Sequence, residues 1–222
     1  MLPTLLRELF QQLEFYSSHR APQLLTGLAI CGFLLILLPD DRLAILAFLA
    51  QRLVALALLW SAIQVPLGTT SIIASTAVAV IYAVTELRLF LAARRKALPD
   101  GRGAGRMSLP FGALAAALGL LVTYGALQTW VGDLLPMVVA FPAILLTVNG
   151  FLVLLLASNA GRTGLGILTL VDACRVLYAL WQPNLLVWGL WSACDVLVAV
   201  SASHLHSAQV ASLRAETGEG AT

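Results

Sequence analysis

Ionisable and amide side chains occur at a few points inside long apolar stretches of this 222-residue sequence. They form three groups, one per stretch: Gln51 with Arg52, Asp172 with Arg175, and Asp195 alone. A charged group in an apolar environment is stable only when it is paired, hydrated or neutralised, so such groups commonly carry protons or ions. The residue types therefore predict proton or ion movement. The alternative is a structural role as polar contacts that fix helix register.

The spacing of these residues predicts which of them pair. Asp172 and Arg175 are three residues apart, so they share one face of a helix and can form an ion pair. Asp195 has no partner in its own stretch. We expect it to face Arg52, Arg175, a hydrated cavity or another subunit, or to be protonated. Glu86 lies near the end of a further apolar stretch, either as an interfacial residue or, in a tilted helix, as an additional proton relay.

The composition predicts an integral membrane protein. Of all residues, 60% are apolar and 11% are charged, and the mean hydropathy is +0.92. Soluble domains contain roughly 45–50% apolar and about 25% charged residues. These values exclude a soluble enzyme, a nucleic-acid-binding protein and a disordered regulator. The three cysteines lie in apolar stretches without a Cys-x-x-Cys motif, so no metal and no cofactor is expected.

Seven apolar runs are long enough to form membrane-spanning helices, which need about 20 residues each. Their predicted bounds are Pro22–Leu38, Leu43–Gln64, Ser71–Ala93, Leu109–Leu127, Leu134–Leu156, Thr163–Trp181 and Leu185–Leu205. Apolar residues also recur at helical spacing within residues 1–20. This segment is predicted to be an amphipathic helix that lies in the membrane interface, and the alternative is a helix packed on a partner subunit.

The arginine distribution predicts the orientation. With seven spans, the loops of one side contain Arg42, Arg94, Arg95, Lys96, Arg102, Arg106, Arg162 and Arg214, whereas the other side has only Arg7 and Arg20. Positive residues are retained on the cytoplasmic side of membranes. We therefore expect an external N-terminus and a cytoplasmic C-terminus.

The chain also shows an internal duplication. Residues 32–38 (Gly-Phe-Leu-Leu-Ile-Leu-Leu) resemble residues 150–156 (Gly-Phe-Leu-Val-Leu-Leu-Leu). Each copy continues with an arginine, a span with a polar centre, a tryptophan and a proline. An all-α protein with a 3+1+3 parallel duplication follows from this pattern. Its predicted segments are the interfacial helix 1–20, the first repeat 21–96, a cytoplasmic loop and separator helix 97–133, the second repeat 134–208 and a cytoplasmic tail 209–222.

The register between the two copies stays open. Counting back from Trp60 and Trp181 aligns Gln51 with Asp172, whereas alignment on the arginines pairs Arg52 with Arg175.

Two short stretches carry a family resemblance: residues 48–54 (Phe-Leu-Ala-Gln-Arg-Leu-Val) and 192–196 (Ser-Ala-Cys-Asp-Val). With the three-helix plan, they resemble the smallest core membrane subunit of respiratory complex I and the small subunit of multi-subunit cation/proton antiporters. A doubled version of about this length is the component E subunit of hydrogenase-4 and formate hydrogenlyase-type complexes. The resemblance spans residues 22–208 and implies a bacterial or archaeal cytoplasmic membrane.

The resemblance implies a membrane-arm subunit without a catalytic centre of its own. Such a subunit would contribute to proton or ion translocation and anchor antiporter-like and complex I-like membrane subunits. By position, Asp172 and Asp195 stand in for the two glutamates of the family's proton path. The first copy departs from the pattern because it has Gln51 in place of a carboxylate, unless Glu86 reaches inward.

Two other functions remain open. One is a stand-alone seven-helix transporter of small solutes. The lack of internal prolines in the predicted first, second and sixth spans counts against it. The other is a scaffold that holds partner subunits without conducting ions.

Overall fold

The computed structural model describes residues 21–38, 40–59, 65–95, 109–128, 137–179 and 184–216. These residues form seven α-helices: α2 (Ala21–Leu37), α3 (Asp41–Leu59), α4 (Val65–Arg95), α5 (Leu109–Ala126), α6 (Met137–Leu155), α7 (Ala160–Tyr178) and α8 (Leu185–Glu216). The described part of the chain contains no strand, which confirms the all-helical class. The predicted interfacial helix 1–20 and the loop before α5 lie outside the described residues.

Helices α4 and α8 are longer than the apolar runs that predicted them, with 31 and 32 residues. Helix α4 begins at Val65, and Pro66 occupies its first turn, where a missing backbone N–H breaks no intrahelical bond. Helix α8 continues to Glu216 through polar residues, past the predicted boundary at residue 208. Its sequence has neither glycine nor proline from residue 190 to its end, so no residue there stops the helix.

Two helical segments, Gly68–Leu89 and Leu185–Ser212, are long and apolar enough to cross a membrane by length and composition. Shorter apolar helical segments comprise Pro22–Leu37, Pro110–Ala126 and Val139–Leu155. Helices α3 and α7 are 19 residues long and contain charged residues in their interiors. The length criterion therefore supports two spans, and the seven-span arrangement stays a prediction.

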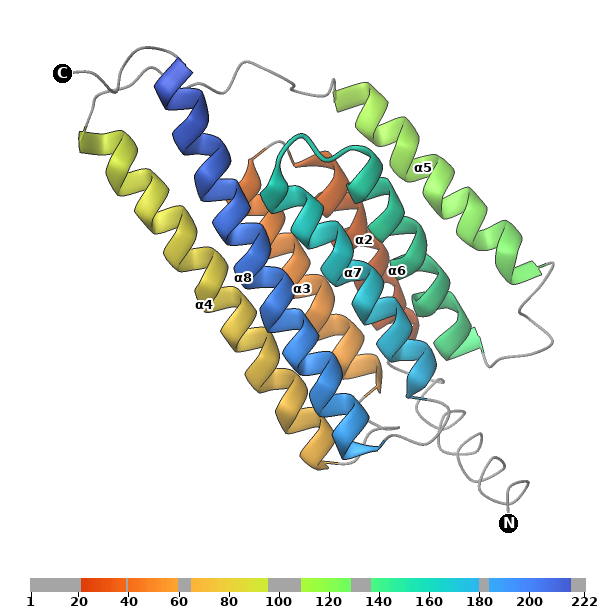
Figure 1. Ribbon diagram of the computed structural model, residues 1–222. Coiled ribbons are helices and arrows are strands. Elements are labelled where there is room, and N and C mark those ends of the chain that lie inside the picture. The colour runs from red at the N-terminus through yellow and green to blue at the C-terminus, as the bar shows by residue number, and fades with distance from the viewer. Residues whose placement is uncertain are drawn as a thin grey trace.

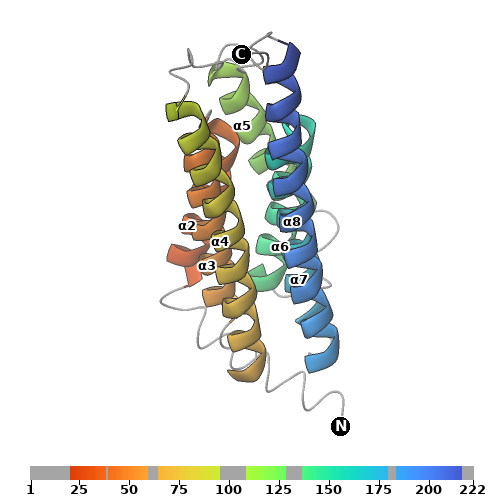
Figure 2. The ribbon, with the colours of Figure 1, turned by 60° about the vertical axis from the view of Figure 1, so that its left-hand side comes forward.

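The helices form two layers, with α2, α3 and α4 in one and α6, α7 and α8 in the other (Figure 2). Each helix of the first layer contacts its counterpart in the second, so that α2 packs on α6, α3 on α7 and α4 on α8. Consecutive helices run antiparallel, and the members of each pair therefore run in the same direction (Figure 1). Helix α5 lies outside the two layers and contacts α2 and α6.

The core divides into two apolar clusters along the helix axes. One cluster surrounds Trp188 and includes Leu28 and Val176. The other includes Phe48 and Leu168. Along α3 and α7, buried polar residues lie between the parts of the chain that enter these two clusters.

Helix α7 approaches α8 and α4 closely at Gly164. A Cβ atom at this position would overlap the Cβ of Ala202 and would stand 2.5 Å from the phenolic oxygen of Tyr82. The backbones of α7 and α8 and the side chain of Tyr82 on α4 can therefore meet here only because residue 164 has no side chain.

Gly164→Ala is expected to destabilise the bundle by about 1–2 kcal/mol, because the added methyl group must displace α8 or Tyr82. Unfolding by sodium dodecyl sulfate in mixed micelles measures this change. Gly189→Ala on α8 is the matched control, since a Cβ there meets no atom within 4 Å. The control should leave stability unchanged or raise it slightly, and equal effects of the two variants would refute the close-packing explanation.

Candidate functional site

Four buried charged residues meet between the two apolar clusters. Arg52 comes from α3, Asp172 and Arg175 come from α7, and Asp195 comes from α8. Their relative exposures are 4%, 6%, 5% and 0%, respectively. We call these four residues the charge quartet. It contains two guanidinium groups and two carboxyl groups, so its charges balance.

Every arginine of the quartet contacts both aspartates. Arg175 donates from Nη1 to Asp172 Oδ1 at 3.3 Å and from Nη2 to Asp195 Oδ2 at 2.7 Å. Arg52 Nη2 lies 3.1 Å from Asp172 Oδ1 and also donates a hydrogen bond to Asp195 Oδ2. The ion pair of Asp172 with Arg175, expected from helical spacing, is thus formed. It is part of a larger network that also includes Arg52 of α3 and Asp195 of α8. Asp195 finds its partners in both arginines.

Aromatic rings border the quartet on two sides. The guanidinium carbon of Arg52 lies 5.8 Å from the ring centroid of Phe48, and that of Arg175 lies 5.9 Å from the ring of Trp188. Both distances fall within the range of cation–π contacts. Trp188 donates from Nε1 to the hydroxyl of Ser71 at 2.6 Å, which fixes the indole against α4.

The quartet retains hydrogen-bonding capacity. Arg52 Nη1, Arg175 Nε and Asp195 Oδ1 are buried and have no partner within the described protein. A pocket of about 20 Å³ lies beside the two arginines, lined by Arg52, Asp172 and Arg175 and by Ser71 and Ser75 of α4. Such a volume holds about one water molecule. The site can therefore exchange a proton with a water molecule without opening a large cavity.

Gln51 does not join the quartet through any hydrogen bond. It is 1% exposed, and both atoms of its amide lack a partner in the described protein. Arg52, and not Gln51, contacts Asp172. Both carboxyl groups of the quartet thus come from the layer of α6, α7 and α8. The layer of α2, α3 and α4 supplies Arg52 and the serines that line the neighbouring pocket.

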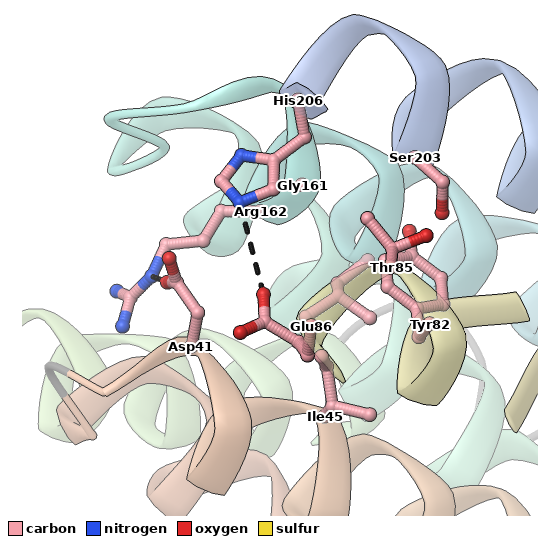
Figure 3. A pocket seen from close by; sticks show the side chains of 10 residues that line it. Asp41, Ile45, Tyr82, Thr85, Glu86, Gly161, Arg162, Ser203 and His206 are labelled. Carbon is pink, nitrogen blue, oxygen red and sulfur yellow. Dashed lines mark hydrogen bonds and ion pairs between the residues drawn. The ribbon is translucent and has the colours of Figure 1, made fainter. Parts of the chain in front are cut away.

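Glu86 lies away from the quartet, near the end of the bundle where α3 and α7 begin (Figure 3). Its carboxylate is 3.6 Å from Arg42 Nε and 3.7 Å from His206 Nε2. Its side chain is 20% exposed. The structure therefore places Glu86 in a second polar site, separate from the charge quartet.

Arg162 connects the two layers at the same end. Its Nε donates to Asp41 Oδ1 at 2.9 Å, and its Nη2 donates to the carbonyl of Leu38. Asn159 caps α7, accepting from the backbone N–H of Arg162 at 2.8 Å and donating to Asp41 Oδ2 at 2.8 Å. The sequence analysis used Arg162 as a loop charge and as a marker of the internal duplication, and it assigned no role to Asp41 and Asn159. An asparagine directly before an apolar helix is a recognisable N-cap signal.

Other neighbours of the sites had no signal that singled them out. Ser71, Tyr82 and Ser203 are buried hydroxyl residues within apolar runs, and Trp188 is one of five tryptophans. Among the described residues, no group of three or more His, Cys, Asp and Glu side chains is arranged to hold a metal ion.

The fold and the site define an all-helical bundle of two parallel layers built around a buried, charge-balanced quartet. Comparisons with protein-family models, curated proteins and solved structures found no significant match.

Proposed function

We propose that this chain is an integral membrane subunit of a complex I-like, hydrogenase-4-like or antiporter-like assembly. Its charge quartet forms part of a proton or ion pathway, and its outer surface anchors partner membrane subunits. In this proposal all seven helices span the bilayer in a 3+1+3 arrangement. The end of the bundle with Arg42, Arg162 and His206 faces the cytoplasm, in agreement with the positive-inside rule.

The outer surface supports a membrane environment. Large apolar side chains are widely exposed on the helices; examples are Leu46 (61%), Ile73 (68%), Leu121 (69%), Leu155 (79%) and Leu186 (76%). Soluble proteins rarely expose apolar surface on this scale, because water solvates it poorly. Lipid chains or the helices of partner subunits would cover it at little cost.

The quartet is the observation that carries the proposal. Asp172 and Asp195 share both arginines. When one carboxylate takes up a proton, each guanidinium therefore stays paired with the other carboxylate. This sharing lowers the cost of protonating a buried group beside buried cations. Asp172 lines the neighbouring pocket, which provides a position where a proton can pass to a water molecule, and Asp195 Oδ1 is a further buried acceptor without a partner in the described protein.

The pocket size favours proton movement over solute transport. About 20 Å³ beside the quartet is too small for a sugar or an amino acid. A larger pocket of about 350 Å³ between α7 and α8 is lined mostly by apolar residues and none of the quartet.

Purification of the tagged protein from its native membrane in mild detergent, followed by mass spectrometry, tests the assembly. Antiporter-like subunits in fixed ratio are the expected result, and recovery of a lone monomer or homo-oligomer contradicts the proposal. Asp172→Asn and Asp195→Asn then test conduction in the reconstituted complex. We expect proton transport to fall by about tenfold or more, the effect of adding roughly 1.4 kcal/mol to a barrier.

Asp40→Asn serves as the matched control, because Asp40 is exposed and outside the quartet. It should retain full transport and assembly. Loss of partner subunits in the Asp172 and Asp195 variants, with unchanged transport in the complexes that still form, would instead identify the chain as a non-conducting scaffold.

A further inference from the structure

A second polar pocket lies at the end of the bundle where Glu86 is located. Four helices contribute to it: α3 with Asp41, α4 with Tyr82 and Glu86, α7 with Arg162, and α8 with Ser203 and His206. Its volume is about 10 Å³, close to the space that one water molecule occupies. Figure 3 shows Tyr82, Thr85 and Ser203 on one side of Glu86, with Asp41 and Arg162 on the other.

The pocket contains buried polar atoms that the protein itself does not satisfy. The phenolic oxygen of Tyr82 and the hydroxyl of Ser203 have no partner, although the two residues are only 4% and 7% exposed. His206 Nδ1 also lacks one. An unpaired buried hydroxyl costs about 1–3 kcal/mol, so these atoms favour a bound water molecule that carries the missing hydrogen bonds.

The charged groups around this pocket leave one carboxylate available for a proton. Asp41 is engaged by Arg162 and Asn159. Glu86 has only longer contacts, with Arg42 at 3.6 Å and His206 at 3.7 Å. Because a proton passes most readily between weakly held groups and water, Glu86 and His206 are the acceptors that this arrangement offers.

Each of the four helices places at least one apolar residue that is at most 1% exposed between this pocket and the quartet. These residues are Phe48 on α3, Val78 on α4, Leu168 on α7 and Ala199 on α8. We call them the apolar layer. None is more than 1% exposed, and all belong to one packed cluster.

The spacing along the helices gives the axial separation of the backbone positions that border this layer. On α4, Val78 separates Ser75 of the quartet pocket from Tyr82 of the second pocket. Seven residues from Ser75 to Tyr82 correspond to about 10 Å along a helix. Asp195 and Ser203 on α8 are eight residues apart, or about 12 Å. Proton transfer needs hydrogen bonds of about 2.7–3.0 Å, so a dry layer of this depth blocks it.

We propose that the second pocket is a proton-exchange site, in which a water molecule held by Tyr82 and Ser203 links Glu86 and His206 to the apolar layer. The proton arrives from the aqueous side, resides on Glu86 beside His206, and crosses to the quartet only when water enters the layer. This inference rests on the proposed function of the quartet. It adds a site at which protons enter the pathway and a barrier, the apolar layer, that controls their passage to the quartet.

Val78→Thr tests the barrier, because threonine has nearly the shape of valine and adds a hydroxyl to the layer. In proteoliposomes of the intact complex, with an imposed potential and an internal pH dye, passive proton conductance should rise about tenfold. That change corresponds to a barrier lower by roughly 1.4 kcal/mol. Val84→Thr is the matched control on the same helix, since Val84 is 43% exposed and outside the layer. It should conduct like the unmodified complex.

Combining variants tests the route. Adding Tyr82→Phe or Glu86→Gln to Val78→Thr should return conductance to the unmodified level, and Glu86→Asp should preserve the increase. If Val78→Thr does not fold, Ala199→Ser opens the same layer from α8. Conductance that stays high without Tyr82 and Glu86, or that never rises in either layer variant, overturns this inference.

The proposed function can fail separately from this inference. The proposed function is contradicted when Asp195→Asn leaves proton transport by the reconstituted complex unchanged. If Asp195→Asn abolishes transport but the layer variants change nothing, the quartet conducts and protons reach it by another route.

Discussion

Asp195→Asn is expected to destabilise the protein by about 3–5 kcal/mol, the typical cost of removing one partner from a buried ion pair. Asp195 is fully buried and accepts hydrogen bonds from Arg52 and Arg175 through one oxygen. In the asparagine variant, two guanidinium groups depend on Asp172 alone, and the site carries an uncompensated positive charge. Unfolding by sodium dodecyl sulfate in mixed micelles measures the loss.

The double variant Arg175→Gln/Asp195→Asn separates charge balance from proton transfer. It removes one charge of each sign and leaves the 3.1 Å pair of Arg52 with Asp172. Because a balanced neutral replacement of buried charges costs little, we expect most of the lost stability to return. Proton transport should stay low, since Asp195 no longer has a titratable carboxyl group. A double variant as unstable as the single one would refute the charge-balance argument, and restored transport would refute the role of Asp195.

The buried charges were the part of the site that sequence reasoning identified most directly. A charged side chain in an apolar stretch is stable only when it is paired, hydrated or neutralised, so a pair of Asp172 with Arg175 and a contact of Asp195 with Arg52 or Arg175 were among the predicted arrangements. The sequence left open whether Gln51 corresponds to Asp172 or Arg52 to Arg175 in the two copies. Which residue of α3 contacts Asp172 is a separate question, because it depends on the rotation of α3 against α7, and the structure places Arg52 there.

The second pocket was not predictable in the same way. Serine occurs often in apolar helices, because its hydroxyl can bond to a carbonyl one turn earlier, as Ser75 does to Ser71 at 2.7 Å. Tyr82 and Ser203 become candidate site residues only because their hydroxyl groups are buried without a hydrogen-bond partner in the described structure. Glu86 was a candidate proton relay because of its charge. Its partner His206 could not be identified from the sequence, because it lies 120 residues away.

The helices themselves followed from the apolar runs, and their ends did not. Hydropathy marks where a chain is apolar, whereas a helix ends where a capping group or a glycine or proline stops it. Helix α8 therefore continues through a polar segment beyond Leu205. The 3+1+3 duplication stays a prediction.

Arg162→Ala is expected to cost about 2–3 kcal/mol, since hydrogen bonds of charged groups contribute about 1.5–3 kcal/mol and this side chain makes more than one. Arg162 is 15% exposed and holds Asp41 and the carbonyl of Leu38, so it fixes the turn between α2 and α3 onto α7. Detergent unfolding measures the change. Arg88→Ala, an exposed arginine on α4, should stay within about 0.5 kcal/mol of the unmodified protein.

Arg162→Lys distinguishes charge from geometry. Lysine keeps the positive charge but cannot donate from a planar guanidinium to Asp41 and to the Leu38 carbonyl at the same time. We therefore expect it to lose about half as much stability as the alanine variant. A lysine variant as stable as the unmodified protein would mean that charge alone matters at this position. An alanine variant no less stable than Arg88→Ala would mean that the two layers are joined without this contact.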